Sequence, residues 1–189
     1  MGDVIQKYKQ EVAKRLCKSR AGSFDASKSE RMTEAIFFPS FHPEAVLQVW
    51  PVEAGSVIRF ATMTSSLWYF EQERGVSKNP VAGKPARPLM PPEVVEEVVQ
   101  VPETTAARFW RKLDKLARRG LKDANPIGVD GMSVVASYQR GEDAISFETW
   151  SPDQASAPGK FLRLLCDLAR DALKTELSVE RLEQLFGYL

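Results

Sequence analysis

Residues 129–150 read Val129-Asp-Gly-Met-Ser-Val-Val-Ala-Ser-Tyr-Gln-Arg-Gly-Glu-Asp-Ala-Ile-Ser-Phe-Glu-Thr-Trp150. Two runs of β-branched and aromatic residues flank a short polar segment around Gly141, a pattern typical of a β-hairpin. In the second run Ile145 and Phe147 alternate with polar residues, which places one side of the strand toward a core and the other toward solvent. The sequence therefore predicts an antiparallel sheet.

Three runs upstream of the hairpin carry the same residue types, at 45–51, 57–60 and 66–70. A turn signal, Glu53-Ala-Gly-Ser56, follows the first of them. We predict that these runs form an antiparallel meander. A further run at 94–101, Val-Val-Glu-Glu-Val-Val-Gln-Val, could return as a strand closed by Pro102, although its pair of glutamates would also suit a short helix.

Apolar residues at three- and four-residue steps predict four helices. An amphipathic helix is expected near residues 3–20, and a second begins at a Thr104 or Thr105 cap and ends near Gly120. The most apolar helix follows Gly159 and should pack across the sheet. A short last helix should begin at a Ser178 cap.

The order of these elements predicts an α+β fold, with an antiparallel sheet of about five strands covered on one face by helices. We assign residues 1–33 to an N-terminal helical arm with a polar tail, and residues 34–189 to a single domain. We expect regular structure to begin again near Ala35, after the polar segment of the arm. The stretch 75–92 holds five prolines and two glycines, so we expect it to form one long loop.

The composition excludes several function classes. The chain has 189 residues with a single histidine and two cysteines, too few for a zinc cluster or a disulfide framework. No phosphate-binding loop, dinucleotide fingerprint or nucleophile motif occurs, so we expect no cofactor, no metal and no enzyme activity. The N-terminus lacks a secretory apolar core, and no apolar run is long enough to span a membrane. We expect a cytoplasmic protein without a membrane partner, in which Cys17 and Cys166 are reduced.

One enzymatic alternative stays open at this point. His42 lies between two prolines just before a predicted strand, where it could carry a proton near neutral pH. A small enzyme or ligand-binding domain could use a pocket near His42 with the carboxylates of Glu44, Glu53 and Glu148. Cys166 lies on the apolar face of its helix and is expected to be an inert core residue.

Charge is unevenly distributed along the chain. The net charge is +1, yet residues 1–20 hold six basic residues against two acidic ones, and residues 103–122 hold seven against two. The rest of the chain is therefore acidic. The basic helix at 103–119 could grip phosphates, which makes a nucleic-acid-associated factor a second alternative. We do not favour nucleic acid as the partner, because the polar face of this helix lacks aromatic residues for stacking on bases.

Aromatic side chains in the predicted strands are the candidates for binding a protein partner, since exposed aromatic residues anchor many interfaces. The candidate residues also include one carboxylate of the final strand. They are Trp50, Trp68, Tyr69, Glu148 and Trp150. The alternative for the aromatic residues is that they belong to the core.

The C-terminal part of the chain resembles small stand-alone bacterial α+β proteins. The resemblance rests on Val129-Asp-Gly, the hairpin that ends in Trp150-Ser-Pro152, and the leucine-rich helix after it, and it covers about a third of the chain. Some of these proteins are similar to immunity proteins that neutralise toxins of contact-dependent or type VI secretion systems. The resemblance implies a non-enzymatic, protein-binding protein that occludes a cognate toxin, and it transfers no site residue. The acidic remainder of the chain would suit a basic, nucleic-acid-cleaving toxin.

Overall fold

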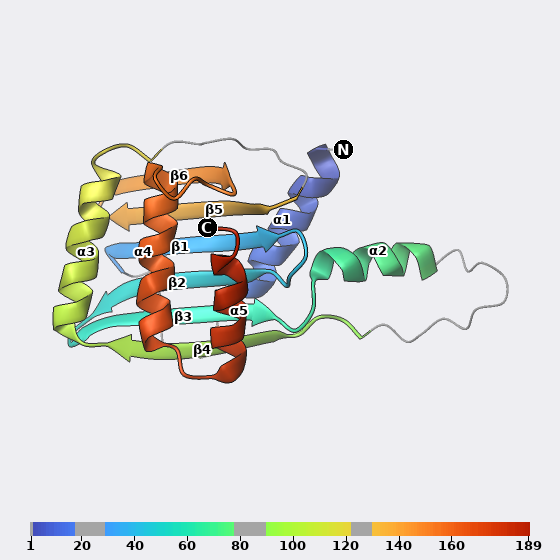
Figure 1. The fold of residues 1–189 in the computed structure, drawn as a ribbon, viewed down its shortest axis with the longest axis horizontal. Coiled ribbons are helices and arrows are strands. Elements are labelled where there is room, and N and C mark those ends of the chain that lie inside the picture. The colour runs from blue at the N-terminus through green and yellow to red at the C-terminus, as the bar shows by residue number, and fades with distance from the viewer. Residues whose placement is uncertain (1, 18–28, 78–89, 122–129) are drawn as a thin grey trace.

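The computed structural model describes residues 2–17, 29–77, 90–121 and 130–189. In these ranges six strands form one antiparallel sheet in the order β4-β3-β2-β1-β5-β6, and five helices accompany it (Figure 1). The strands are β1 (Arg31–Pro39), β2 (Ala45–Val52), β3 (Gly55–Met63), β4 (Val94–Val101), β5 (Met132–Arg140) and β6 (Asp143–Trp150). The helices are α1 (Gly2–Leu16), α2 (Leu67–Ser77), α3 (Glu103–Ala117), α4 (Ala157–Ala172) and α5 (Glu176–Phe186). The predicted α+β class is confirmed, with six strands instead of about five.

The hairpin predicted for residues 129–150 is present. Strands β5 and β6 pair antiparallel from Ser133 opposite Trp150 to Arg140 opposite Asp143. Gly141 in the connecting turn has a φ of +58°, which glycine adopts without steric cost. β5 also pairs with β1 over the whole length of β1, so the hairpin is joined to the meander through the centre of the sheet.

Helices lie on both faces of the sheet. The C-terminal helices α3, α4 and α5 cover one face, and α1 lies against the other (Figure 1). Alternate strand residues supply the two cores, as Phe37 and Leu47 show on the face of the three helices. On the opposite face Ile36 packs with Val12 and Leu16 of α1. The N-terminal helix is therefore packed on its own sheet and builds a second, smaller core.

The prediction of a strand at 66–70 is wrong, because helix α2 begins at Leu67. The carboxylate of Glu44, which is fully buried, accepts the backbone N–H groups of Leu67 at 2.9 Å and Trp68 at 3.3 Å. A carboxylate at the start of a helix satisfies its free N–H groups and interacts favourably with the helix dipole. The cap comes from a residue more than twenty positions away, so local β propensity gave the wrong element.

Several element boundaries also differ from the predictions. β1 begins at Arg31, earlier than expected, and extends into the segment assigned to the polar arm. Helix α3 begins at Glu103 after Pro102, without a threonine cap, and α5 is capped by Thr175 instead of Ser178. The stretch 94–101 forms a strand, which decides between the strand and the short helix that its sequence left open. Most of the predicted proline-rich loop, 78–89, lies outside the described residues, as do residues 18–28 of the predicted arm.

Candidate functional site

Two of the predicted partner-binding residues, Trp50 and Trp68, pack against other parts of the protein. Trp50 on β2 is 3% exposed, so it is a core residue and not part of an interaction surface. Trp68 on α2 is half-buried and packs edge-on against Tyr8 of α1, with ring centroids 5.1 Å apart. Both tryptophans therefore stabilise the packing of elements around the sheet.

Glu148 and Trp150 of β6 face the side of the sheet on which α1 lies. The Glu148 carboxylate forms an ion pair with Lys9 of α1 and accepts a hydrogen bond from the Ser133 hydroxyl at 3.3 Å. Trp150 is half-buried, and its indole lies so close to Gly131 that a Cβ there would approach Nε1 to 2.7 Å. Glu148 thus helps to hold α1 on the sheet, and Trp150 packs against the entry to β5.

Tyr69 differs from the other candidates because it is exposed. Its side chain is 45% exposed, and that of nearby Phe41 in the β1–β2 connection is 60% exposed. The Tyr69 hydroxyl donates to the carbonyl oxygen of Ser40 at 3.1 Å. A second hydrogen bond, of 2.9 Å, joins His42 Nδ1 to the Tyr188 hydroxyl. We call Phe41, His42, Tyr69 and Tyr188 the aromatic end.

The groups that an enzyme near His42 would use are not gathered there. Glu44 precedes β2 and Glu53 follows it, so the two carboxylates lie at opposite ends of that strand. Glu148 lies on another strand, β6, where it forms an ion pair with Lys9 of α1. His42 lines neither of the two pockets described below.

Neither cysteine has the environment of a reactive thiol. Cys166 is fully buried in α4, and this burial raises the pKa of its thiol well above the ordinary value. Burial, together with the charge of Glu34, raises the pKa of Cys17 to about 12. Because the thiolate is the reactive form of cysteine, both side chains stay protonated and inert near neutral pH.

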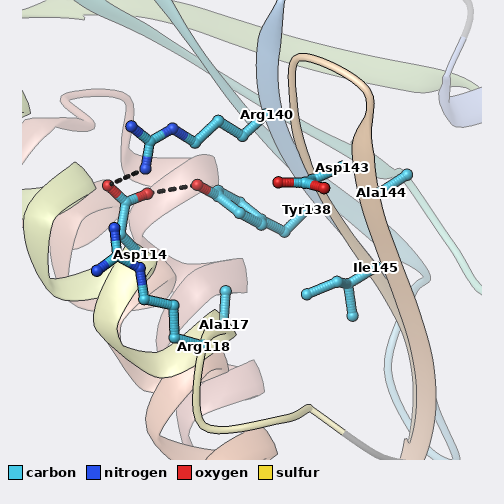
Figure 2. Close-up of a pocket in the computed structure, with 8 residues that line it drawn as sticks. All are labelled: Asp114, Ala117, Arg118, Tyr138, Arg140, Asp143, Ala144 and Ile145. Carbon is cyan, nitrogen blue, oxygen red and sulfur yellow. Dashed lines mark hydrogen bonds and ion pairs between the residues drawn. The ribbon is translucent and has the colours of Figure 1, made fainter.

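The first pocket lies between α3 and the β5–β6 hairpin and has a volume of about 290 Å³. Figure 2 shows its lining residues, which are Asp114, Ala117, Arg118, Tyr138, Arg140, Asp143, Ala144 and Ile145. The Asp114 carboxylate points toward the Tyr138 hydroxyl and toward Arg140, whose Nη1 lies 3.1 Å away (Figure 2). Outside the drawn set, Arg31 of β1 also pairs with Asp114.

Asp114 holds the end of α3 on the sheet. Burial tends to raise the pKa of its carboxyl group, but hydrogen bonds from Tyr138 and Arg31 and the positive charges of Arg31 and Arg140 outweigh this effect. The pKa of Asp114 is therefore below its ordinary value, and the carboxylate stays ionised. Three donors occupy its oxygens, which indicates a structural role.

The second pocket is a groove between α3 and α4, with a volume of about 370 Å³. Its lining residues are Lys112, Lys115, Leu116, Arg119, Gln154, Lys160, Arg163, Leu164 and Asp167, and we call this set the basic groove. Five of them are cationic and one is acidic. Within the part of the chain that the structure describes, none of the five cations forms an ion pair.

The sequence indicated the cations of one wall of the basic groove but not those of the other wall. The basic helix at 103–119 supplies Lys112, Lys115 and Arg119, whereas the contribution of Lys160 and Arg163 depends on the packing of α4 beside α3. The signal for the other wall was present in the spacing of α4, which repeats the pattern of cations and leucine found in α3. Only the fold shows that the two patterns face one groove.

Comparison of the sequence with models of known protein families and with curated proteins finds no match. Among the described residues, no three histidine, cysteine, aspartate or glutamate side chains come together as ligands for a metal ion. Within the same residues, no helix has the length and apolar character needed to cross a membrane. The exposed surfaces are therefore the basis on which a function is proposed.

Proposed function

We propose that this is a non-enzymatic, protein-binding protein whose partner docks on the aromatic end. The observation that carries the proposal is the exposure of Phe41 and Tyr69, at 60% and 45%, on one end of the molecule. Large aromatic side chains contribute much of the binding energy in protein interfaces when a partner removes them from water. Neither Phe41 nor Tyr69 belongs to the two cores of the sheet.

The aromatic end is already ordered in the free protein, which supports a binding role. The Tyr69 hydroxyl is held by the Ser40 carbonyl group, and the Tyr188 hydroxyl is held by His42. The rings of His42 and Tyr188 also pack edge-on, with centroids 5.7 Å apart. Because these side chains lose little rotamer freedom on binding, less of the interaction energy is spent on ordering them.

The charge beside the aromatic end suits a basic partner. Helix α2 carries Tyr69 and, one turn further along the same face, the exposed residue Glu73. A carboxylate next to aromatic anchors favours the approach of a positively charged protein. A bacterial toxin with a basic, nucleic-acid-binding active site has this chemistry, so we propose an immunity protein that occludes such a toxin, in line with the resemblance of the C-terminal part.

A cytoplasmic location belongs to the same proposal. Both cysteines are free thiols, as expected for a protein kept in a reducing compartment. The absence of enzyme activity is also part of the proposal, and it is supported by the protonated thiols and by the engagement of His42 with Tyr188.

The test is co-expression with the product of the adjacent gene, followed by purification through a tag on that product. We expect a stable complex with the wild-type protein, and its loss with the double variant Phe41→Ala/Tyr69→Ala. The control is Val98→Ala/Val179→Ala, which removes exposed apolar side chains from β4 and α5. This control should bind like the wild type, and both variants should unfold at the wild-type temperature.

The immunity role has its own readout. The neighbouring gene product expressed alone should arrest growth, and the wild-type protein should restore it, whereas Phe41→Ala/Tyr69→Ala should not. A partnerless monomer in the presence of the co-expressed neighbour would argue against the whole proposal. Complex formation that is indifferent to both aromatic substitutions would instead place the interface elsewhere on the molecule.

A further inference from the structure

Helix α3, which forms one wall of the basic groove, lies at the other end of the sheet from α2 and the β1–β2 connection (Figure 1). The proposed function does not use this groove. Its two walls present two cations and a leucine at the same spacing, and differ in the fourth residue, which is basic on one wall and acidic on the other. On α3 and the turn that follows it the residues are Lys112, Lys115, Leu116 and Arg119, and on α4 they are Lys160, Arg163, Leu164 and Asp167. Both sets follow the i, i+3, i+4, i+7 spacing that places residues on one face of a helix.

The shape of the groove follows from the packing of these helices. Helices α3 and α4 lie side by side and run antiparallel (Figure 1). Leu116 and Leu164 occupy equivalent positions of the two patterns, and both are half-buried, so each offers apolar surface within the groove. Each patterned face spans about two helical turns.

The charge of the groove is not compensated from within the described chain. Its single acidic residue, Asp167, is paired with Arg170 at 2.8 Å and not with a cation of the groove. Five positive charges held on two adjacent helices repel one another, and the repulsion is relieved when an anionic group binds between them. The groove is therefore suited to a ligand that carries several negative charges.

We infer that the basic groove binds an acidic amphipathic helix of a protein partner. Glutamate and aspartate side chains of that helix pair with the lysines and arginines on both sides. An apolar side chain at the centre of the helix contacts Leu116 and Leu164. A helix laid along the two antiparallel helices buries one face over two turns, which is the helix-in-groove mode of recognition.

A helix fits the groove better than a nucleic acid for two reasons. The half-buried leucines at its centre match an apolar side chain, whereas a sugar–phosphate backbone has no such group to place there. The lining residues include no aromatic ring, so bases that follow a bound backbone find no stacking platform. The cations of the groove can pair with carboxylates of a peptide. The apolar contact with the two leucines distinguishes a peptide helix from a nucleic acid.

The probe for the test is a synthetic, fluorescently labelled peptide with glutamates flanking leucines at i, i+3 and i+7. Its length is about 18 residues, because shorter isolated helices are marginal in water. One comparison peptide has the glutamates replaced by glutamine, and another has the leucines replaced by serine. A mixed-sequence DNA oligonucleotide, single-stranded or duplex, is the competitor that represents nucleic acid. Binding is measured by fluorescence anisotropy on the full chain.

The variant is Lys115→Glu/Arg163→Glu, which reverses one charge on each wall of the groove. The control is Lys7→Glu/Lys14→Glu, which changes the net charge equally with exposed residues of α1 on the other face of the sheet. We expect the groove variant to weaken binding of the glutamate–leucine peptide at least about tenfold, and the control to change it less than about threefold. Circular dichroism and thermal unfolding should match the wild type for both variants.

The outcomes separate this inference from the proposed function. Weak binding of both comparison peptides supports the inference. Equal binding of the glutamate and glutamine peptides, equal loss in the groove and control variants, or tighter binding of the DNA would overturn it. The variant Phe41→Ala/Tyr69→Ala should bind the peptide normally, so a failure of the aromatic end as a docking surface leaves this result unchanged.

Discussion

The guanidinium group of Arg59 donates from Nη2 to the carbonyl oxygen of Leu16, the last residue of α1, at 2.8 Å. Arg59 lies on β3 and is 1% exposed. Its Nη1 donates to Gln48 on β2 at 2.9 Å, and its Nε donates to Glu96 on β4 at 2.8 Å. A single buried cation thus joins three strands to the C-terminal end of α1, where the helix dipole favours a positive charge.

Replacement of Arg59 by methionine should destabilise the protein strongly. The variant Arg59→Met keeps much of the side-chain volume but removes the donors to Leu16, Gln48 and Glu96. Loss of one partner from a buried charged network costs about 3–5 kcal/mol, so we expect the free energy of unfolding to fall by that amount and the urea midpoint to fall with it. Helix α1 should also become accessible to hydrogen exchange, because its last carbonyl group loses its partner on the sheet.

The matched control is Arg140→Met. Arg140 also pairs with a carboxylate, that of Asp114, but its side chain is 51% exposed. Exposed ion pairs contribute about 1 kcal/mol or less, so this variant should unfold near the wild-type midpoint. Equal destabilisation by the two substitutions would show that burial of Arg59 is not the source of its contribution.

A second prediction concerns alkaline stability and Tyr8. Tyr8 donates its hydroxyl hydrogen to Glu44, and burial, followed by the charge of Glu44, raises the pKa of the phenol above its ordinary value of 10.0. The folded protein therefore keeps a proton that the unfolded chain releases above about pH 10. The stabilisation is complete below that pH and declines by about 1.4 kcal/mol per pH unit above it.

The variant Tyr8→Phe tests the alkaline contribution directly. It should be less stable than the wild type at neutral pH by about 1 kcal/mol, the typical net contribution of one hydrogen bond. Its stability should fall less steeply above about pH 10, because the titrating group is gone. Urea unfolding across the alkaline range measures both slopes, and identical slopes would contradict the assignment to Tyr8.

The sequence was sufficient for elements whose signals are local. The β5–β6 hairpin, the apolar face of α3 and the leucine-rich α4 all follow from periodicity and turn residues within each segment. Gly120, predicted to end α3, indeed has a φ of +83°, in the left-handed region that favours glycine. The α+β class follows from the order of these elements.

The sequence was not sufficient where a distant residue decides the local structure. Helix α2 depends on a cap from Glu44, and the docking of α1 depends on Arg59 and Tyr8, which lie on different elements. The same limit applies to the surfaces. Tyr69 and Trp68 are adjacent in the chain, yet one is exposed and the other packs on α1, because the position of α2 beside α1 decides which side chain is covered.

A third prediction concerns acid stability and Asp114. Its pKa lies below the ordinary value of 3.8, because hydrogen bonds from Tyr138 and Arg31 outweigh the effect of burial. The stabilisation is therefore present above about pH 4 and is lost as the pH falls through the lowered value. The variant Asp114→Asn should be less stable than the wild type at neutral pH and should lose less stability on acidification. Parallel acid curves for the two proteins would refute this role.

The last prediction compares two glycines with positive φ. Gly55, at the start of β3, has a φ of +133°, and a Cβ there would lie 2.1 Å from the carbonyl oxygen of Val101 on β4. The variant Gly55→Ala must separate the backbones of β3 and β4, so we expect a loss of at least about 3 kcal/mol. Gly141 has a φ of +58° and no atom within 4 Å of such a Cβ. Gly141→Ala should therefore cost only about 1–2 kcal/mol, from the left-handed conformation alone. Urea unfolding measures both variants, and equal losses would show that the close approach of Gly55 to Val101 does not restrict the side chain.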